Sequence, residues 1–456
     1  MTRSIDEIPV TDGIAVPPPP PQPPASKRLG RVMSLAMVVG TVIGSGIYVL
    51  PATVASFGPN VIAAFALTII GTMTLALTLA ALARRIPGGP YNYVAAAFGD
   101  RVAFVTMWSY LVAVWTAIAA VAIAAGGALG HLFPAIANGA GLTIFAIAAV
   151  LVLTLVNLRG ARSAGTVQVV ATLIKIVPLL LVVLLVLGRL GTGRPLEPLA
   201  AVPLSVGGMI GAAALMLFAF TGFETAALSA NVTDDAEIAV PKATIRGTIF
   251  VALIYLTATV SVLWLLPSAV ASHSSAPFAD ATAPTLGAFA GALVTIIAAI
   301  SALGTGNSQI LVGIEIMRSI ANAGDLPPIF ARTNRAGVSV ASLVVSAVVA
   351  ILLILASNSD SFVELFSFVA LVSAVAALVL YAVCAAAALK VKSSPVALAG
   401  LALIYAIAMF FGAGREATLW GLGLALVGLP IRYLSRRFSS AATSPAAGAV
   451  PAAPRE

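Results

Sequence analysis

Two ionisable side chains lie deep inside strongly apolar stretches, Lys175 within residues 164–188 and Glu224 within residues 205–231. A charge inside a membrane segment costs about 2.5–3.5 kcal/mol on insertion scales, so such groups are usually functional. We therefore expect Glu224 to exchange a proton or to gate a path, with a structural hydrogen bond to a neighbouring helix as the alternative. Lys175 could exchange its proton too, or its long side chain could reach the inner surface of the membrane.

Glycines interrupt two apolar segments that occupy matching places in the two halves of the chain. Gly40, Gly44 and Gly46 lie in the first, and Gly222 lies in the second. Unwound backbone at membrane depth is tolerated only where it lines a protein cavity. The N-terminal end of a half-helix favours an anion such as a carboxylate. Matched interruptions therefore predict the substrate site of a transporter, although Gly40 and Gly44 also fit small-residue helix packing.

The elements that carry these groups are predicted to be transmembrane helices. The 456 residues are 60% hydrophobic and only 9% charged, whereas a soluble protein carries roughly 25% charge. Apolar runs repeatedly exceed the ~18 residues that a spanning helix needs. We expect an all-α polytopic membrane protein with twelve transmembrane helices, at residues 32–56, 59–83, 99–129, 140–158, 164–188, 205–231, 243–267, 283–320, 338–356, 361–389, 395–413 and 416–434.

The basic residues indicate how these helices are oriented. If the N-terminus is inside, all but four of the 24 lysines and arginines fall on the inner side, as the positive-inside rule requires. The net charge of +8 is then a topology signal and gives no reason to expect nucleic acid as a partner. We expect a disordered, proline-rich cytoplasmic tail (1–30), a membrane transport domain (31–437) and a flexible cytoplasmic tail (438–456), in the inner cell membrane. Because the second interrupted helix begins outside, five helices after the first, a five-plus-five inverted repeat follows.

Five short segments, taken together, carry a family resemblance: Gly44–Ile47 with Leu50 and Pro51, Pro87–Tyr91, Phe220–Glu224, Pro241–Ile245 and Pro328–Asn334. They resemble the amino acid–polyamine–organocation (APC) transporter superfamily, and especially its bacterial arginine/agmatine and basic amino acid antiporters. The resemblance implies a LeuT-like fold, in which ten core helices form the inverted repeat and helices 1 and 6 are discontinuous. It also implies alternating access around a site between helices 1, 3, 6 and 8.

The resemblance and the interruptions together give a set of candidate residues. Phe218 would cover the substrate as an aromatic gate, although packing is the alternative. Glu224 would couple protonation or gating to transport, and Lys175 would replace the sodium ion of sodium-coupled relatives. Tyr110 and Gln309 are further candidates. The substrate-binding residues are expected to be Ile43, Gly44, Ser45, Gly46, Trp115, Thr116, Phe218, Ala219, Thr221, Asn307 and Ser308.

Two departures from the arginine antiporters concern the substrate. Residues 99–129 contain no asparagine, and Asn307 or Ser308 stands where the antiporters have a tryptophan, so arginine specificity is not implied. Apart from Asp100 at the inner end of helix 3, helices 1 and 3 offer no acidic residue to a cationic side chain, which favours neutral or broad substrates. The alternative is that carbonyls and aromatic faces hold a guanidinium. We expect a sodium-independent secondary transporter of amino acids, working by exchange or proton symport. A polyamine or organic-cation transporter of the same fold is the alternative.

The sequence lacks the motifs of two other classes of protein, enzymes and primary pumps. The two histidines, His131 and His273, both fall in predicted outer loops, and Cys384 is the only cysteine. Neither a metal site nor a nucleophile–base pair is indicated, so we expect no enzyme, catalytic residue, metal or cofactor. No GxxxxGK[ST] motif of a primary pump is present. The expected partners are a small amino acid, the lipid bilayer and, if transport is coupled to them, protons; the protein would be a monomer or homodimer.

Overall fold

The described part of the chain is all-α. The computed structural model describes every residue except 1–41, 87, 159–163, 225–235, 358–360 and 443–456, and none of the described residues forms a strand. The predicted N-terminal tail lies outside these residues, and so does 443–456 of the predicted C-terminal tail. The helices are α2 (Gly46–Val54), η2 (Ala55–Phe57), α3 (Asn60–Arg85), α4 (Pro90–Phe98), α5 (Asp100–Gly130), η3 (Pro134–Ile136), α6 (Gly139–Leu158), α7 (Ala164–Gly191), α8 (Val206–Phe220), α10 (Ala236–Leu265), α11 (Ser268–Ala271), α12 (Pro277–Leu286), α13 (Ala288–Asn322), η5 (Pro328–Phe330), α14 (Val340–Ala356), α15 (Phe362–Lys390), α16 (Val396–Gly412) and α17 (Arg415–Ala442).

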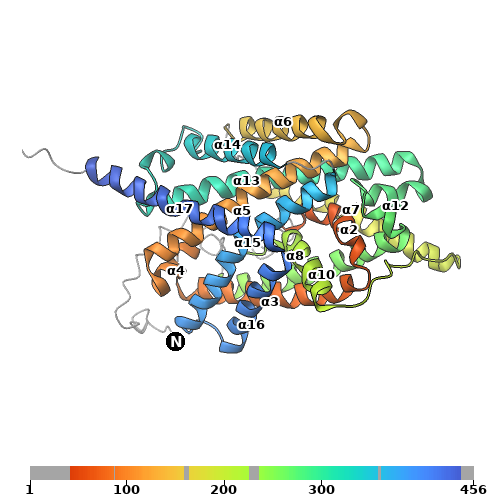
Figure 1. Cartoon of the computed structure of the whole chain (residues 1–456), viewed down its shortest axis with the longest axis horizontal. Helices are drawn as coiled ribbons and strands as arrows, with labels where there is room; N and C mark the ends of the chain where they lie inside the picture. Colours follow the sequence, from red (N-terminus) through yellow and green to blue (C-terminus); the bar gives the residue numbers. More distant parts are fainter. Residues whose placement is uncertain (1–41, 87, 159–163, 225–235, 358–360, 443–456) are drawn as a thin grey trace, which may run out of the picture.

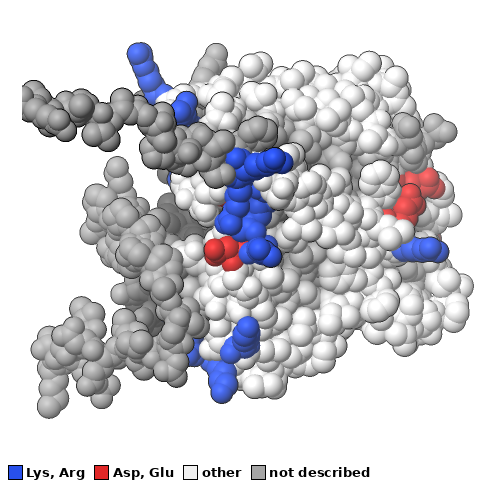
Figure 2. All heavy atoms as spheres, turned by 60° about the vertical axis from the view of Figure 1, so that its left-hand side comes forward, with Lys and Arg blue, Asp and Glu red and all other residues white. Residues whose placement is uncertain are grey.

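Eight of the described helices are long and apolar enough to cross a membrane: α3, α5, α6, α7, α10, α13, α15 and α17. Four shorter apolar segments accompany them, formed by α2 with η2, α8, α14 and α16. Together they overlap the twelve predicted ranges. Figure 2 shows charged side chains toward two ends of the molecule, with a broad uncharged surface between them. Such a surface suits the ~30 Å hydrocarbon layer of a bilayer.

Helix α5 forms the centre of the molecule. Its apolar window is wholly buried, whereas only 28% of the corresponding windows of α6, α7 and α17 is buried. In a membrane protein a helix that is apolar on all sides can face either protein or lipid, so these fractions separate inner helices from peripheral ones. Helices α13 and α15 make the most extensive contacts with α5. Figure 1 shows α13 running alongside α5, while α6 and α14 cover one edge.

A buried ionic cluster joins three elements at the end of the molecule where α4 begins. The carboxylate of Asp325 is completely buried and accepts hydrogen bonds of 2.8 Å from Nε of Arg432 and Nε of Arg436. The hydroxyl of Tyr91 donates to its other oxygen at 2.8 Å. Burial is the main cause that raises the pKa of Tyr91, and the hydrogen bond to Asp325 raises it further. The phenol therefore stays neutral and keeps its donor. The cluster fixes α4 and α17 to the segment between α13 and α14.

Candidate functional site

The two glycine-containing interruptions meet near the middle of the molecule. Residues 43–45 form bends instead of a continuous helix, and α2 begins at Gly46. Helix α8 ends at Phe220, where the chain turns and Gly222 adopts a φ of 113°. That value lies in the left-handed region that favours glycine. A Cβ atom on Gly46 would lie only 2.8 Å from the Cα atom of Ala219, so α2 and α8 are in direct backbone contact here.

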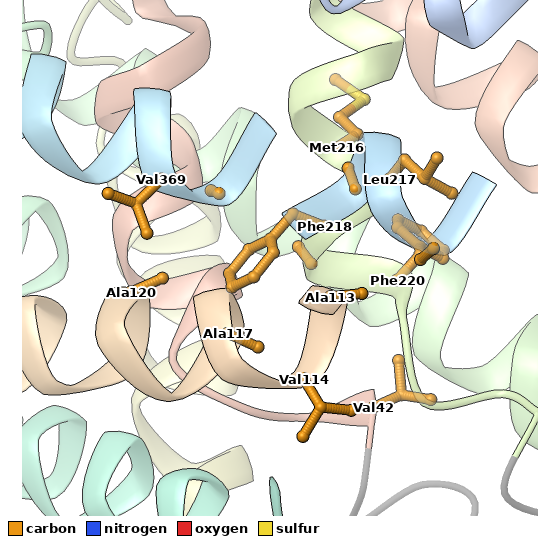
Figure 3. Close-up of a cluster of buried hydrophobic side chains, with 14 of the residues drawn as sticks. Val42, Ala113, Val114, Ala117, Ala120, Met216, Leu217, Phe218, Phe220 and Val369 are labelled. Atoms are coloured by element: carbon orange, nitrogen blue, oxygen red, sulfur yellow. The ribbon is translucent and has the colours of Figure 1, made fainter. Parts of the chain in front are cut away.

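A cavity of about 50 Å³ lies between the two interruptions. Helices α5 and α13 complete its wall. Phe218 projects from α8 into the space between Ala117 of α5 and Val369 of α15 (Figure 3), and its ring packs edge-on against Phe366. The lining residues are Val42, Gly44, Ser45, Gly46, Tyr110, Val121, Phe218, Ala219, Thr221, Gly222, Glu224, Thr305, Ser308, Gln309 and Val312.

Glu224 supplies the only carboxylate among these lining residues, and it is 5% exposed. Its Oε1 atom accepts a 2.7 Å hydrogen bond from the hydroxyl of Tyr110, which lies 114 residues away on α5. Its Oε2 atom accepts a 3.0 Å bond from the backbone N–H of Gly222. Both oxygens of this buried carboxyl group therefore have a hydrogen-bond partner. The side chain therefore links the end of α8 to the central helix.

The carbonyl groups of the unwound backbone before α2 accept hydrogen bonds from side chains of three other helices. The carbonyls of residues 42–44 accept, in order, from the hydroxyl of Tyr255 at 2.7 Å, from Nζ of Lys175 at 3.2 Å and from the hydroxyl of Ser301 at 3.3 Å. Buried carbonyls that have left a helix need such partners in place of the lost helical hydrogen bonds. The Lys175 ammonium thus points at the interruption, and the side chain is only 6% exposed.

Most of the sequence-derived candidates lie around this cavity. Gly44, Ser45 and Gly46 line it from the first interruption. Phe218, Ala219 and Thr221 line it from α8 and the turn that follows, and Ser308 lines it from α13. The carbonyl of Ile43 binds Lys175 beside the cavity.

Three candidates lie elsewhere. Trp115 donates through Nε1 to the hydroxyl of Ser346 on α14 at 3.0 Å. Thr116 binds backbone carbonyls of its own helix and lines a second cavity of about 380 Å³ near Glu364 and Glu416. Asn307 accepts a 2.7 Å bond from the amide of Asn157 on α6. None of the three lines the central cavity.

Thr305 and Val312 line the cavity although the sequence analysis did not single them out. With Ser308 and Gln309 they recur at helical spacing, so all four lie on one face of α13. Helical periodicity would have identified Thr305 and Val312 once Ser308 or Gln309 had been assigned to the cavity. Val42, Val121 and Gly222 also line the cavity. Gly222 belongs to the second interruption, whereas no feature of the sequence distinguishes Val42 and Val121 from packing residues.

Known proteins are similar to this chain over most of its length. A family model described as amino acid permease matches residues 29–414. The cadaverine/lysine antiporter of Escherichia coli (strain K12) is 30% identical over 331 residues, which cover 71% of this chain and 73% of that protein. The putative arginine/ornithine antiporter of Bacillus subtilis (strain 168) is 28% identical, with coverages of 91% and 98%. The putrescine transporter PotE of E. coli (strain K12) is 26% identical, with coverages of 89% and 96%. The chain belongs to the amino acid permease family of the APC superfamily.

Proposed function

We propose that this protein is a sodium-independent secondary transporter that carries amino acids across the cytoplasmic membrane by alternating access, through exchange or proton coupling. Its relatives are named as a cadaverine/lysine antiporter, a putative arginine/ornithine antiporter and a putrescine transporter. The observation that carries the proposal is the contact of 3.2 Å between Nζ of Lys175 and the carbonyl of Ile43. A protein-borne cation already stands beside the interrupted helix, where a coupling ion would otherwise supply positive charge.

The proposed topology has twelve transmembrane helices, a LeuT-like inverted repeat and both termini in the cytoplasm. Support comes from the twelve apolar segments and from the interruptions before α2 and after α8. The second interrupted helix comes five predicted spans after the first, and a repeat with an odd number of spans inverts the second copy relative to the first.

We propose that the first turn of α2 binds the substrate carboxylate. The carbonyls of residues 42–44 are occupied by side-chain donors, and the cavity is lined by Gly46, where α2 begins, and by Gly44 and Ser45 just before it. Helix N-termini favour anions through their N–H groups and through the helix dipole. The substrate ammonium would then face the C-terminal end of α8, where the backbone carbonyls and the carboxyl group of Glu224 are hydrogen-bond acceptors.

Alternating access requires groups whose contacts differ between the two states. Glu224 and Phe218 are our candidates, because Phe218 near the end of α8 contacts Phe366 on α15 and Glu224 just after α8 contacts Tyr110 on α5. We propose that Phe218 gates the substrate. Glu224 would couple proton binding to gating by exchanging its bond with Tyr110 for a proton.

The test is uptake of labelled amino acids into proteoliposomes in sodium-free buffer. Uptake driven by unlabelled amino acid inside would identify an exchanger, and uptake that needs an inward proton gradient would identify a symporter. Lys175→Met should abolish uptake in either case, while Arg189→Met, at the end of the same helix, should leave it intact. Strict dependence on sodium in the unmodified protein, or full activity of Lys175→Met, would refute the proposed role of Lys175.

A further inference from the structure

The central cavity offers very little negative charge to a substrate. Among its lining residues Glu224 is the only acid, and both of its oxygens already accept hydrogen bonds, from Tyr110 and from Gly222. The other polar lining groups are hydroxyls and one carboxamide, belonging to Ser45, Thr221, Thr305, Ser308 and Gln309. These groups are uncharged hydrogen-bonding partners.

The cavity is also small. Its volume of about 50 Å³ is on the order of four times the ~10–15 Å³ that holds one water molecule on the same measure. Thr305 narrows it, because its Oγ1 atom lies 2.9 Å from where a Cβ of Gly44 would stand. Val121 and Val312 add apolar surface to the wall. The space suits a substrate with a short side chain.

Gln309 lines the cavity from α13, on the side toward which the proposed binding arrangement would direct a substrate side chain. Thr305, Ser308, Gln309 and Val312 form the α13 wall, and Thr305 faces the first interruption at Gly44. Gln309 lies one helical turn further along the same face. A substrate whose carboxylate binds the first turn of α2 therefore directs its side chain toward this wall, where Gln309 has the longest polar side chain.

A cationic side chain at this wall would have no counter-charge. An ammonium that loses its water shell without gaining a carboxylate is strongly disfavoured. A neutral side chain meets the Gln309 carboxamide, which can donate or accept, and the hydroxyls of Thr305 and Ser308, which donate to backbone carbonyls of α13 and can still accept. The relatives carry the names of antiporters for lysine, cadaverine, arginine and ornithine, and of a putrescine transporter. The wall of this chain is chemically suited to a different substrate.

We infer that the cavity selects small amino acids with uncharged side chains and that Gln309 sets this selectivity by presenting an amide where a cationic substrate needs a carboxylate. This inference rests on the proposed function and narrows its substrate class. The charge at residue 309 can be varied on its own, because glutamate has almost the same shape as glutamine and differs by one negative charge.

The experiment is exchange in proteoliposomes loaded with a mixture of unlabelled amino acids. External labelled L-alanine, L-serine, L-lysine and cadaverine are compared at equal concentrations. The unmodified protein should exchange alanine or serine at least tenfold faster than lysine or cadaverine. Gln309→Glu should change the lysine-to-alanine ratio at least tenfold in favour of lysine. Asn322→Asp, which adds the same charge at the exposed end of α13, should leave the ratio unchanged.

Gln309→Met is a second variant of similar volume that keeps the wall neutral, and it should still reject lysine. Thermal melting of each purified variant shows that it is folded. Exchange of lysine or cadaverine as fast as alanine by the unmodified protein would overturn the inference and leave the proposed function standing. An unchanged ratio in folded Gln309→Glu would overturn the role of Gln309. Absence of all amino acid uptake by folded protein, both with unlabelled amino acid inside and with an inward proton gradient, would overturn the proposed function, and the inference with it.

Discussion

The contact between the two interruptions can be tested by adding one methyl group at Gly46. A Cβ atom there would lie 2.8 Å from Cα and 2.9 Å from Cβ of Ala219. Carbon atoms pack best at about 3.5–4.0 Å, so α2 and α8 would have to separate by roughly 0.7 Å. The obstacle is the backbone of α8, which has no side-chain rotation to relieve the clash. Overpacking of this kind costs about 1–3 kcal/mol.

Alanine also favours the helical state over glycine by about 0.5–1 kcal/mol, which offsets part of that cost. The net destabilisation of the substrate-binding arrangement by Gly46→Ala is then about 1–2 kcal/mol, equivalent to a five- to thirty-fold loss of affinity. The assay is equilibrium binding of labelled substrate to purified protein, together with a thermal melt. Affinity should fall in this range and the melting temperature should drop.

The matched control is Gly423→Ala on α17, where an added Cβ meets no atom within 4 Å. It gains the helix preference of alanine without a clash, so binding should be unchanged and the melting temperature equal or higher. If Gly46→Ala binds substrate and melts as the unmodified protein does, the two interruptions do not approach each other this closely in the binding state, and the reasoning fails.

Three further perturbations follow from single contacts. Tyr110→Phe removes a hydrogen bond to the Glu224 carboxylate, so stability should fall by about 1.5–3 kcal/mol with a slower exchange rate; unchanged melting and exchange would contradict the contact. Asp325→Asn leaves Arg432 buried without its counter-charge, and chemical denaturation should reveal a loss of about 3–5 kcal/mol; a loss below 1 kcal/mol would show that the cluster contributes little. Cys384 is 1% exposed within α15, so a maleimide should label it only after unfolding, as mass spectrometry would show; rapid labelling of folded protein would contradict its burial.

The sequence by itself predicted the class of protein and the location of its helices along the chain. Long apolar runs with few charges can bury their backbone polar groups in a membrane only as helices or closed barrels, and the described chain is all-α. Residues 43–45 and the turn after Phe220 lie within the glycine-containing stretches. Glycine weakens a helix wherever it lies, so this information is local. Lys175 and Glu224 stood out because charge is rare in such surroundings.

Only the tertiary structure decided which side chains meet. Nothing local indicates that Tyr110 reaches Glu224 across 114 residues, or that Lys175 reaches Ile43 across 132. An apolar membrane helix has little amphipathic pattern to tell its inner face from its outer one. Asn307 therefore looked equivalent to its neighbours in the sequence, and helix rotation alone turns it toward α6 while the next two residues line the cavity. Packing against neighbouring helices fixes that rotation, and hence the chemistry of the site.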